Sequence, residues 1–460
     1  MDGNLALRTD MYKFSHAPLY PPGTSTVYSY FEARDNSQFD KTVFFGLQYI
    51  IKEYLEGKVF TYDKIDEAEE LLNQAFGAMV FKRELFDYIV EKHNGYLPIK
   101  IKAVPEGSYI EKSNVLMTVE NTDPQCFWLT NFLETLLSQV WYPCTVATVS
   151  RRMKEIINRY LLMTGNNDGL QFKLHDFGFR GVSSVESAGI GGCAHLVNFL
   201  GTDTVEAIQV ARKYYNESCA GFSIPASEHS TITSWGPDSE DIAMKNMLDK
   251  YPDGIIACVS DSFDIYRACN DYWGGSLKDM VIARNGTLVV RPDSGEPTEV
   301  VPKILSILWD KFGGSITNQG YKLLDQHVRV IQGDGINLTS LENILKSVAA
   351  NGFCTDNLAF GCGNGILQRV NRDDCSFAFK CSAINRNGEW QDVYKEPVTD
   401  KGKNSKRGRL KLINFAESYH TVDENDGDKP NELITVFENG KLTKEYTLAE
   451  IRERINSYVV

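Results

Sequence analysis

Two glycine-rich turns have the composition of phosphate-binding loops. They are QGDG at residues 332–335 and GCGNG at residues 361–365, and each follows a short apolar run. Glycine lets backbone N–H groups approach a phosphate closely, and a helix that follows such a turn adds a favourable dipole. Either turn alone is more typical of an ordinary tight turn than of a phosphate loop. Two of them at successive strand ends favour a site for a phosphorylated ligand.

A histidine among polar residues offers a second kind of chemistry. His229 follows Glu228 in the sequence EHST and is one of only seven histidines. A histidine at a strand end can act as an acid, a base or a phosphoryl acceptor, and Asp261 in VSDSFD could orient it through a carboxylate–imidazole pair. His175 is a rival on the same grounds, and a purely structural role is the alternative for both histidines.

Charged residues at two further places suit an anionic ligand. In RPDSG, Arg291 could bind an anion and Asp293 a sugar hydroxyl or a metal ion, with a surface salt bridge as the simpler interpretation. The segment Lys401–Lys411 carries six basic residues in an otherwise acidic chain. A solvated loop is the usual explanation of such a run. A polyphosphate ligand explains it as well, because two phosphate loops need counter-charge.

The pattern around these residues predicts the elements that position them. From about residue 170, seven short apolar runs end in polar or glycine-rich residues and lead into helical stretches. Repeated βα units predict an α/β fold with a parallel sheet, and seven strands suit a closed barrel whose carboxyl ends carry the chemistry. The runs end at His175–Asp176, Gly201–Asp203, Glu228–His229, Ser260–Asp261, Arg291–Asp293, Gly333–Gly335 and Gly361–Gly363.

Both ends of the chain are predicted to be β-rich and to pack together. Lys64–Asn94 is predicted to be helical, and the region from Asp123 to about Thr164 to form two helices separated near Pro143. We expect a β-rich region with helices at residues 1–165, an α/β barrel with most of the active site at 166–380, and a second β-rich region at 381–460. The expected strands are Ser25–Glu32, Ile99–Val104, Val115–Val119, Ile434–Phe437 and Leu442–Tyr446, the last two flanking an Asn-Gly hairpin turn.

Composition excludes several classes of protein. The chain has 460 residues, 42% of them hydrophobic and 24% charged, so wholesale disorder is excluded. The formal charge of −13 argues against a nucleic-acid or anionic-membrane binder. No run has the roughly 18 apolar residues of a membrane span, and no signal peptide is evident. The ten scattered cysteines indicate neither a disulfide framework nor a zinc site, and we expect a cytoplasmic protein.

Long motifs from about residue 8 to 456 resemble, in order, those of the nicotinamide phosphoribosyltransferase family. The resemblance implies the transfer of phosphoribose from phosphoribosyl pyrophosphate to nicotinamide, which yields nicotinamide mononucleotide and pyrophosphate in NAD salvage. It also implies a type II phosphoribosyltransferase barrel, ATP as a coupled substrate, Mg²⁺ with ligands not identified, and a homodimer with active sites at the interface. The motifs include TDMYKFSH (9–16), LPIKIKAVPEG (97–107), LHDFGFRGVSS (174–184), NFLGTDT (198–204), EHSTIT (228–233), VSDSFDIY (259–266), RPDSG (291–295), VIQGDG (330–335) and GRLKL (408–412).

The resemblance implies a role for each candidate residue. Phe177 and the partner subunit's Tyr12 would sandwich the pyridine ring, and Asp203 would accept the carboxamide N–H. His229 would be phosphorylated by ATP, with Asp261 and Glu228 supporting it. Arg291 would line the nicotinamide pocket, and the ribose would be held by Asp293, Gly333 and Asp334. The 5′-phosphate would contact Gly363 and Asn364. The implied cations around the phosphate and pyrophosphate are Arg180, Arg372, Lys380, Lys395, Lys403 and, less strongly, Arg34.

One position departs from the family pattern, and three alternative functions remain. Asn364 stands where the family usually has a third glycine, although asparagine tolerates left-handed backbone angles better than most residues. A related enzyme acting on nicotinate is the first alternative, and Asp203 argues against it because a carboxylate repels a carboxylate substrate. A non-catalytic relative and a generic sugar-phosphate barrel enzyme are the other two.

Overall fold

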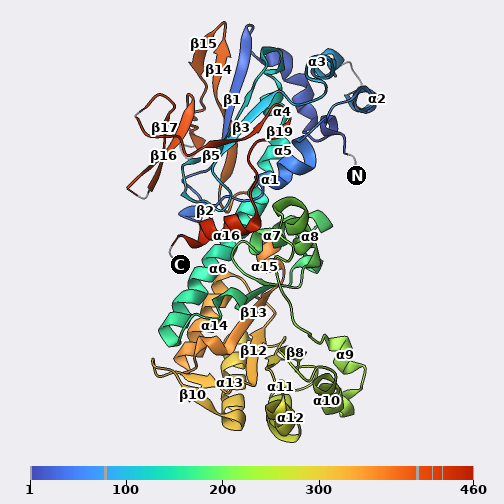
Figure 1. Ribbon diagram of the computed structural model, residues 1–460, viewed down its shortest axis with the longest axis vertical. Helices are drawn as coiled ribbons and strands as arrows, with labels where there is room; N and C mark the ends of the chain where they lie inside the picture. The colour runs from blue at the N-terminus through green and yellow to red at the C-terminus, as the bar shows by residue number, and fades with distance from the viewer. Residues whose placement is uncertain (1–2, 77–79, 400–402, 417, 427, 459–460) are drawn as a thin grey trace. The chain divides into compact units, whose positions relative to one another are not determined.

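A computed structural model describes residues 3–76, 80–399, 403–416, 418–426 and 428–458. The chain forms two units, each with its own large sheet (Figure 1). The antiparallel unit comprises Met1–Thr148, Lys213–Asn216 and Asn371–Tyr458, and the parallel unit comprises Val149–Arg212 and Glu217–Val370. Among the described helices, none is both long and apolar enough to cross a lipid bilayer.

The antiparallel unit is built from both ends of the chain. Its seven-stranded sheet has the order β15-β14-β1-β5-β3-β18-β19, and smaller sheets pair β2 with β4 and β16 with β17. The strands are β1 (Thr24–Ala33), β2 (Lys41–Val43), β3 (Ile99–Ala103), β4 (Tyr109–Glu111), β5 (Val115–Asn121), β14 (Phe377–Arg386), β15 (Glu389–Asp392), β16 (Leu410–Phe415), β17 (Ser418–Asp423), β18 (Ile434–Glu438) and β19 (Lys441–Leu442). Its helices are α1 (Leu47–Ile50), α2 (Tyr62–Phe76), α3 (Arg83–His93), α4 (Leu129–Phe132), α5 (Glu134–Ser138) and α16 (Leu448–Asn456).

Local sequence explains several of these strands. In β3, Ile99, Ile101 and Ala103 are buried while the two lysines between them are partly exposed, which is the alternation of a strand with one buried face. The hairpin between β18 and β19 turns at Asn439 and Gly440, whose φ angles are 51° and 80°. Positive φ at both central residues is the type I′ geometry that an Asn-Gly pair favours.

The parallel unit contains six parallel strands in the order β7-β6-β13-β12-β9-β8. The segment 222–226 forms parallel bridges to both edge strands, from Phe222 to Gly201 of β7 and from Ala226 to Ala257 of β8. These bridges close the sheet into an irregular barrel, which confirms the predicted α/β fold class. The unit also has a two-stranded sheet, β10-β11.

The strands of the parallel unit are β6 (Leu174–Asp176), β7 (Gly201–Thr202), β8 (Ile256–Val259), β9 (Leu288–Arg291), β10 (Gly314–Ile316), β11 (Lys322–Leu324), β12 (Val328–Gln332) and β13 (Leu358–Cys362). The helices are α6 (Trp141–Thr164, which begins in the antiparallel unit), α7 (Val185–His195), α8 (Val205–Tyr215), α9 (His229–Thr233), α10 (Glu240–Lys250), α11 (Ile265–Arg267), α12 (Lys278–Ala283), α13 (Pro297–Phe312), α14 (Leu338–Ala350) and α15 (Asn364–Leu367). All four residues of β8 are buried, as expected for a parallel strand covered on both faces.

Three expectations about elements are wrong. The region after Asp123 contains a 3₁₀ turn and three helices, α4 to α6, instead of two helices. Pro143 does not separate them: it lies in the first turn of α6, where its missing N–H is not needed. The run before Glu228 forms only the two bridges described above, because Pro225 between them cannot donate a backbone hydrogen bond. The strand expected at Leu442–Tyr446 is shorter, since β19 ends at Leu442.

The unit boundaries also differ from the expected ones. Residues 149–165 belong to the parallel unit, where Thr164 at the end of α6 contacts Thr355 through their hydroxyl oxygens at 3.0 Å. Residues 371–380 belong to the antiparallel unit, because β14 pairs with β1 from Phe377 onward.

Candidate active site

A cavity of about 670 Å³ lies at the carboxyl ends of the parallel strands. In barrels of this kind the loops after the strands carry the chemistry. The loops after β6, β7, β9, β12 and β13 all contribute, together with residues 228–230 at the start of α9. The cavity brings together eleven of the residues predicted from the sequence: Phe177, Arg180, Asp203, Glu228, His229, Arg291, Asp293, Gly333, Asp334, Gly363 and Asn364.

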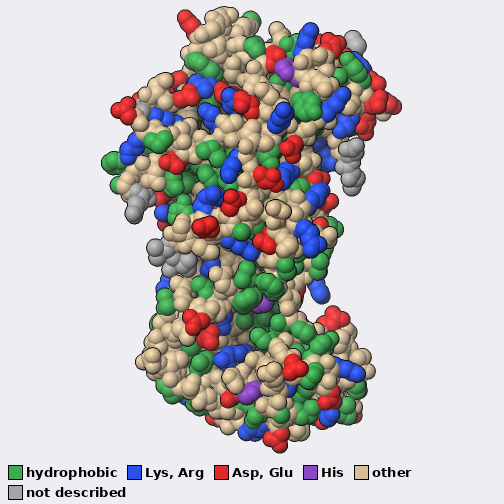
Figure 2. All heavy atoms as spheres, in the orientation of Figure 1, with side chains coloured by type: hydrophobic (Ala, Val, Ile, Leu, Met, Phe, Trp, Pro, Cys, Tyr) green, Lys and Arg blue, Asp and Glu red, His purple; other side chains and the backbone are tan. Residues whose placement is uncertain are grey.

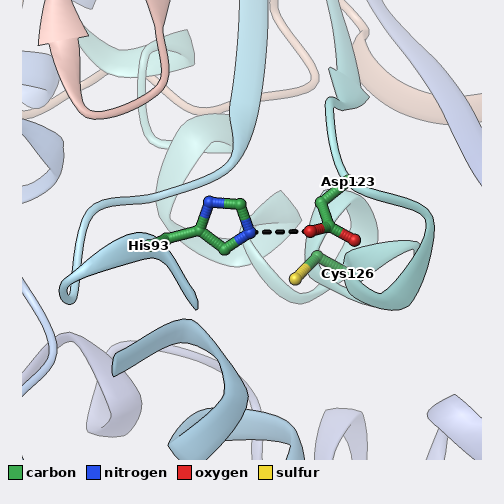
Figure 3. A group of neighbouring side chains, drawn as sticks. All are labelled: His93, Asp123 and Cys126. Atoms are coloured by element: carbon green, nitrogen blue, oxygen red, sulfur yellow. Dashed lines mark hydrogen bonds and ion pairs between the residues drawn. The ribbon is translucent and has the colours of Figure 1, made fainter. Parts of the chain in front are cut away.

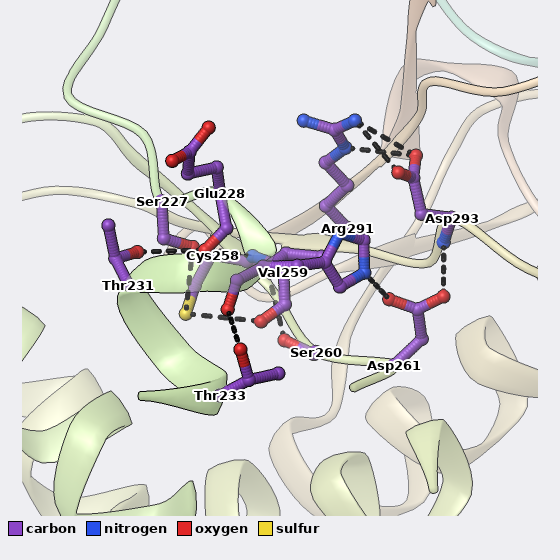
Figure 4. Close-up of polar contacts among 11 residues, drawn as sticks. Ser227, Glu228, Thr231, Thr233, Cys258, Val259, Ser260, Asp261, Arg291 and Asp293 are labelled. Atoms are coloured by element: carbon purple, nitrogen blue, oxygen red, sulfur yellow. Dashed lines mark hydrogen bonds and ion pairs between the residues drawn. The ribbon is translucent and has the colours of Figure 1, made fainter. Parts of the chain in front are cut away.

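Asp261 connects His229 and Asp293, which both line this cavity. Its Oδ1 lies 3.0 Å from His229 Nε2, and its Oδ2 accepts the backbone N–H of Asp293 at 3.1 Å (Figure 4 shows Asp261 beside Asp293). The Asp261 side chain is 3% exposed, whereas that of His229 is 47% exposed. With Nε2 held by Asp261, the imidazole has its Nδ1 available for reaction.

Arg291 and Asp293 form an ion pair in the cavity wall. The guanidinium donates from Nε at 3.1 Å and from NH2 at 2.9 Å to Asp293 Oδ1, and from NH2 at 3.0 Å to Oδ2 (Figure 4). The salt bridge considered as the simpler interpretation is therefore real, but it lies inside the site. A Cβ on Gly333 would come within 3.2 Å of Arg291 Nε, so the glycine turn packs directly against this pair.

The Phe177 ring packs directly against Gly361 of β13, the strand next to β6. A Cβ on Gly361 would lie 2.0 Å from Phe177 Cε2, so only glycine leaves room for the ring. The backbone N–H of Phe177 donates to Cys362 O at 2.9 Å. The Arg291 guanidinium carbon lies 5.6 Å from the centroid of the same ring. Phe177 thus presents a fixed aromatic surface next to a cation, which suits a flat heterocycle.

Asp203 and Asp176 are joined through the backbone next to the cavity. The backbone N–H of Asp203 donates to Asp176 O at 2.9 Å, and Ser223 Oγ donates to Asp203 Oδ1. Asp176 is fully buried, and its Oδ1 accepts the N–H of Gly178 at 2.7 Å. Burial raises the pKa of Asp176 to about 6, against the effect of the Gly178 hydrogen bond. Sequence reasoning did not identify Ser223, because no local pattern distinguishes it from other loop serines.

A second cavity, of about 510 Å³, lies among the barrel strands and shares Phe177, Asp203 and Arg291 with the first. Its apolar wall contains the side chains of Ala257, Val289 and Ile331. His175 lines this second cavity and not the first, and its Nε2 lies 3.1 Å from Phe172 O. Burial lowers the pKa of His175. The geometry therefore favours His229 over its rival as the reactive histidine.

The other predicted ligand contacts belong to the antiparallel unit: Tyr12, Arg34, Arg372, Lys380, Lys395 and Lys403. Tyr12 is exposed and stands edge-on to His16. Burial lowers the pKa of Lys380 most, Glu134 opposes this shift, and repulsion from Arg34, Arg372 and Lys395 adds to it. Four of the six predicted residues are thus close enough to interact electrostatically.

Part of the basic segment Lys401–Lys411 is used within the fold. Lys401 lies outside the described residues. Lys406 Nζ binds Glu32 Oε2 at 2.6 Å, and Arg409 binds both Glu120 and Glu424. These two cations are counter-charges for carboxylates of the fold, which neither the solvated-loop nor the polyphosphate interpretation predicted. The face drawn in Figure 2 likewise shows acidic side chains interspersed among the basic ones.

Asn364 does not need the left-handed conformation considered for it. It is the first residue of α15, and it is absent from the described non-glycine residues with positive φ. Its Cα lies 3.6 Å from where a Cβ on Gly181 would be, so the loops after β6 and β13 are in close contact. An asparagine in place of glycine is compatible with this backbone.

Comparisons with known proteins agree with this geometry. The Nicotinate phosphoribosyltransferase (NAPRTase) family model matches residues 172–441, and the model of the Nicotinamide phosphoribosyltransferase N-terminal domain matches residues 4–101. The chain is 50% identical to the nicotinamide phosphoribosyltransferase of Xanthomonas campestris pv. campestris, over 98% of this chain and 97% of that protein. It is 36% identical to that of Acinetobacter baylyi, over 97% and 96%.

Solved structures show the same fold at much lower sequence identity. The nicotinate-nucleotide pyrophosphorylase from Pyrococcus furiosus has a TM-score of 0.60 at 16% identity, covering 99% of this chain and 95% of that one. Human nicotinic acid phosphoribosyltransferase has a TM-score of 0.58 at 15% identity, covering 98% and 93%.

Proposed function

The chain belongs to the nicotinamide phosphoribosyltransferase family, whose members are pentosyltransferases, and we propose that it joins nicotinamide to the ribose of phosphoribosyl pyrophosphate. The products are nicotinamide mononucleotide and pyrophosphate, which places the reaction in NAD salvage. The observation that carries this proposal is that Phe177, Asp203 and Arg291 line one cavity with His229 and Asp293.

Nicotinamide binds against Phe177, with the partner subunit's Tyr12 covering its other face. Stacking on Phe177 fixes the plane of the pyridine ring. Gly361 supports the proposal, because any larger residue at position 361 would displace the Phe177 ring. Asp203 accepts the carboxamide N–H, and its position is held by Ser223 and by the carbonyl of Asp176. A carboxylate at this place disfavours nicotinate, whose own carboxylate would be repelled.

The transfer itself needs positioning more than acid–base chemistry. The lone pair of the pyridine nitrogen forms the bond to C1′ while the bond from C1′ to the pyrophosphate oxygen breaks, so no proton has to move. The transition state is cationic at the sugar, and the departing pyrophosphate carries the negative charge. Asp293, Gly333 and Asp334 hold the ribose, and Gly363 and Asn364 approach the 5′-phosphate. Arg180 faces the phosphate groups from the same cavity.

The partner subunit of a homodimer supplies further cations to the pyrophosphate. The candidates are Arg372, Lys380, Lys395 and Lys403, with Arg34 as a weaker addition. Their support is electrostatic: burial lowers the pKa of Lys380 most, repulsion from Arg34, Arg372 and Lys395 lowers it further, and a bound polyphosphate would relieve that repulsion.

ATP assists the reaction by phosphorylating His229. Nδ1 attacks the γ-phosphorus, the bond to the ADP oxygen breaks, and ADP leaves. Asp261 supports this step because it holds Nε2 and balances the positive charge that develops on the ring. Glu228, which precedes His229, lines the same cavity. Water later hydrolyses the phosphohistidine and returns the histidine to its starting state.

Mg²⁺ fits the oxygen donors of this cavity. Mg²⁺ is usually held by one or two carboxylates together with substrate phosphates. Glu228, Asp293 and Asp334 line the cavity and offer such carboxylates. When bound, the ion would neutralise charge on the pyrophosphate.

The direct test is formation of nicotinamide mononucleotide by the purified protein, with and without ATP. The proposal expects equal amounts of mononucleotide and pyrophosphate, and a higher yield when ATP is present. A non-catalytic relative would form neither product. A generic sugar-phosphate enzyme would show no dependence on nicotinamide.

A further inference from the structure

Three possible metal ligands of different chemistry converge in the antiparallel unit. They are His93 at the end of α3, and Asp123 and Cys126 at the 3₁₀ turn Pro124–Cys126. Their ligand atoms all lie within 4.8 Å of one another, and His93 Nε2 is 2.7 Å from Asp123 Oδ2. Figure 3 shows the imidazole, the carboxylate and the sulfur directed toward a common point.

The local sequence explains why Asp123 and Cys126 are on the same side of the chain. Asp123 caps the turn by accepting the N–H of Gln125 on Oδ1 at 2.8 Å, and the N–H of Cys126 donates to Asp123 O at 2.9 Å. This tight turn fixes the sulfur next to the carboxylate. Tyr88 of α3 donates from its hydroxyl to Asp123 Oδ2 at 3.1 Å, the same oxygen that His93 contacts, and so also helps to hold the carboxylate.

Burial and access suit a bound ion. The Cys126 side chain is fully buried, while His93 is 26% and Asp123 17% exposed. His93 and Asp123 also line a surface groove of about 610 Å³, together with Tyr96 and Lys441. The groove provides an entry path and room for a water molecule, and Cys126 adds a buried sulfur within 4.8 Å of the other two ligand atoms.

We propose that His93, Asp123 and Cys126 bind a transition-metal ion of the zinc type, with its fourth position open to the groove. One nitrogen, one oxygen and one sulfur ligand are a donor set that Zn²⁺ accepts, whereas Mg²⁺ and Ca²⁺ require oxygen. Tetrahedral coordination at about 2.0–2.3 Å places ligand atoms roughly 3.3–3.6 Å apart. The ion therefore replaces the His93–Asp123 hydrogen bond, and a small rotation of the partly exposed imidazole opens the space.

Binding has a defined proton balance. The thiol of Cys126 loses its proton to solvent when the metal–sulfur bond forms. In the metal-free protein the Nε2–H of His93 donates to Asp123 Oδ2. When the metal binds, this proton passes to solvent and Nδ1 takes one up, so the neutral ring coordinates through Nε2 with no net proton change, and Asp123 coordinates as a carboxylate. The site links the end of α3 to the turn after β5, and it is independent of the proposed phosphoribosyl transfer.

Cobalt(II) is the probe for the test, because it occupies zinc sites and absorbs light when bound to thiolate. The full-length, metal-free protein is titrated with Co²⁺. We expect one ion per chain, a thiolate-to-cobalt charge-transfer band in the near ultraviolet, and visible bands typical of a tetrahedral site. Zn²⁺ should displace the Co²⁺ and raise the Tm of the protein, because it binds only the folded state.

Matched variants decide the assignment. Cys126→Ser should remove the charge-transfer band, and His93→Gln should weaken Co²⁺ binding by about tenfold or more. The controls are Cys219→Ser, at an exposed cysteine, and His420→Gln, at an exposed histidine; both should bind as the wild type does. Because His93 is partly exposed, its variant is expected to fold even if Cys126→Ser does not. The absence of a thiolate band in the wild type, or its persistence in Cys126→Ser, would overturn the proposal, as would unweakened binding by His93→Gln.

Discussion

His229 Nε2 and Asp261 Oδ1 are 3.0 Å apart, and the second oxygen of the same carboxylate accepts the backbone N–H of Asp293 at 3.1 Å. The buried carboxylate of Asp261 thereby connects His229, the proposed phosphoryl acceptor, to Asp293, a proposed ribose ligand. In the mechanism proposed above, this carboxylate would connect phosphorylation of His229 to the ribose site without a large movement of the chain.

Asp261→Asn should reduce phosphorylation of His229 by ATP about tenfold or more, a difference of at least about 1.4 kcal/mol. An amide has only one acceptor oxygen, so it cannot accept from both the imidazole and the Asp293 N–H. Transfer of labelled γ-phosphate from ATP to the protein measures the effect. Asp271→Asn, at an exposed acid, is the control and should label normally. Equal labelling of both variants would contradict the role given to Asp261.

Asp203→Asn should shift the preference between nicotinamide and nicotinate by about tenfold or more toward nicotinate. The amide keeps an acceptor for the carboxamide but removes the charge that repels a carboxylate substrate. The measurement is kcat/KM for each substrate with the wild type and the variant. Equal turnover of the two substrates by the wild type would contradict the selectivity attributed to Asp203.

Gly361→Ala should raise the KM for nicotinamide about tenfold or more. The added Cβ would lie 2.0 Å from Phe177 Cε2, so the phenyl ring would have to move away from its present position. Gly275→Ala is the matched control, because its Cβ would meet only Asn270 O at 3.4 Å. Steady-state kinetics and a circular dichroism spectrum of each variant separate a binding defect from misfolding. An unchanged KM in a folded Gly361→Ala protein would show that Phe177 does not stack on the substrate.

Asp176→Asn should stabilise the protein at pH 8 more than at pH 5. Burial raises the pKa of Asp176 from 3.8 to about 6, so the folded state favours the protonated form. This contribution to stability is complete below about pH 4 and is lost as the pH rises through about 6, on the order of 3 kcal/mol in all. The Tm of variant and wild type at pH 5 and pH 8 measures the difference. A difference in Tm between Asp176→Asn and the wild type that does not grow from pH 5 to pH 8 would contradict a buried, ionising carboxylate at Asp176. The control variant, Asp271→Asn, should show no such growth of the Tm difference with pH.

Sequence patterns predict most of the barrel but not all of it. Six of the seven expected strands form, five of them in short, mainly apolar runs that a parallel sheet buries, while β7 is reduced to Gly201–Thr202. The seventh, expected before Glu228, does not form a strand around Pro225. Among the described residues, this segment joins the barrel only through the isolated bridges of Phe222 and Ala226. The predicted break at Pro143 is wrong because a proline in the first turn of a helix cannot be distinguished, by residue type alone, from a proline between two helices.

The site is predictable as far as its residues lie at strand ends. Parallel strands present their carboxyl ends at one edge, so His229, Arg291 and Asp293 were expected near one another. Ser223 and the seat that Gly361 gives Phe177 depend on contacts between distant segments, which residue types do not reveal. The same holds for His93 and Cys126, since their separation matches no common zinc-ligand spacing.

The decisive measurement is a crystal structure of the protein with nicotinamide mononucleotide bound. We expect the pyridine ring between Phe177 and the partner subunit's Tyr12, with its carboxamide on Asp203 and its ribose at Asp293. A mononucleotide bound away from Phe177 and His229, or a ring whose carboxamide does not contact Asp203, would contradict it.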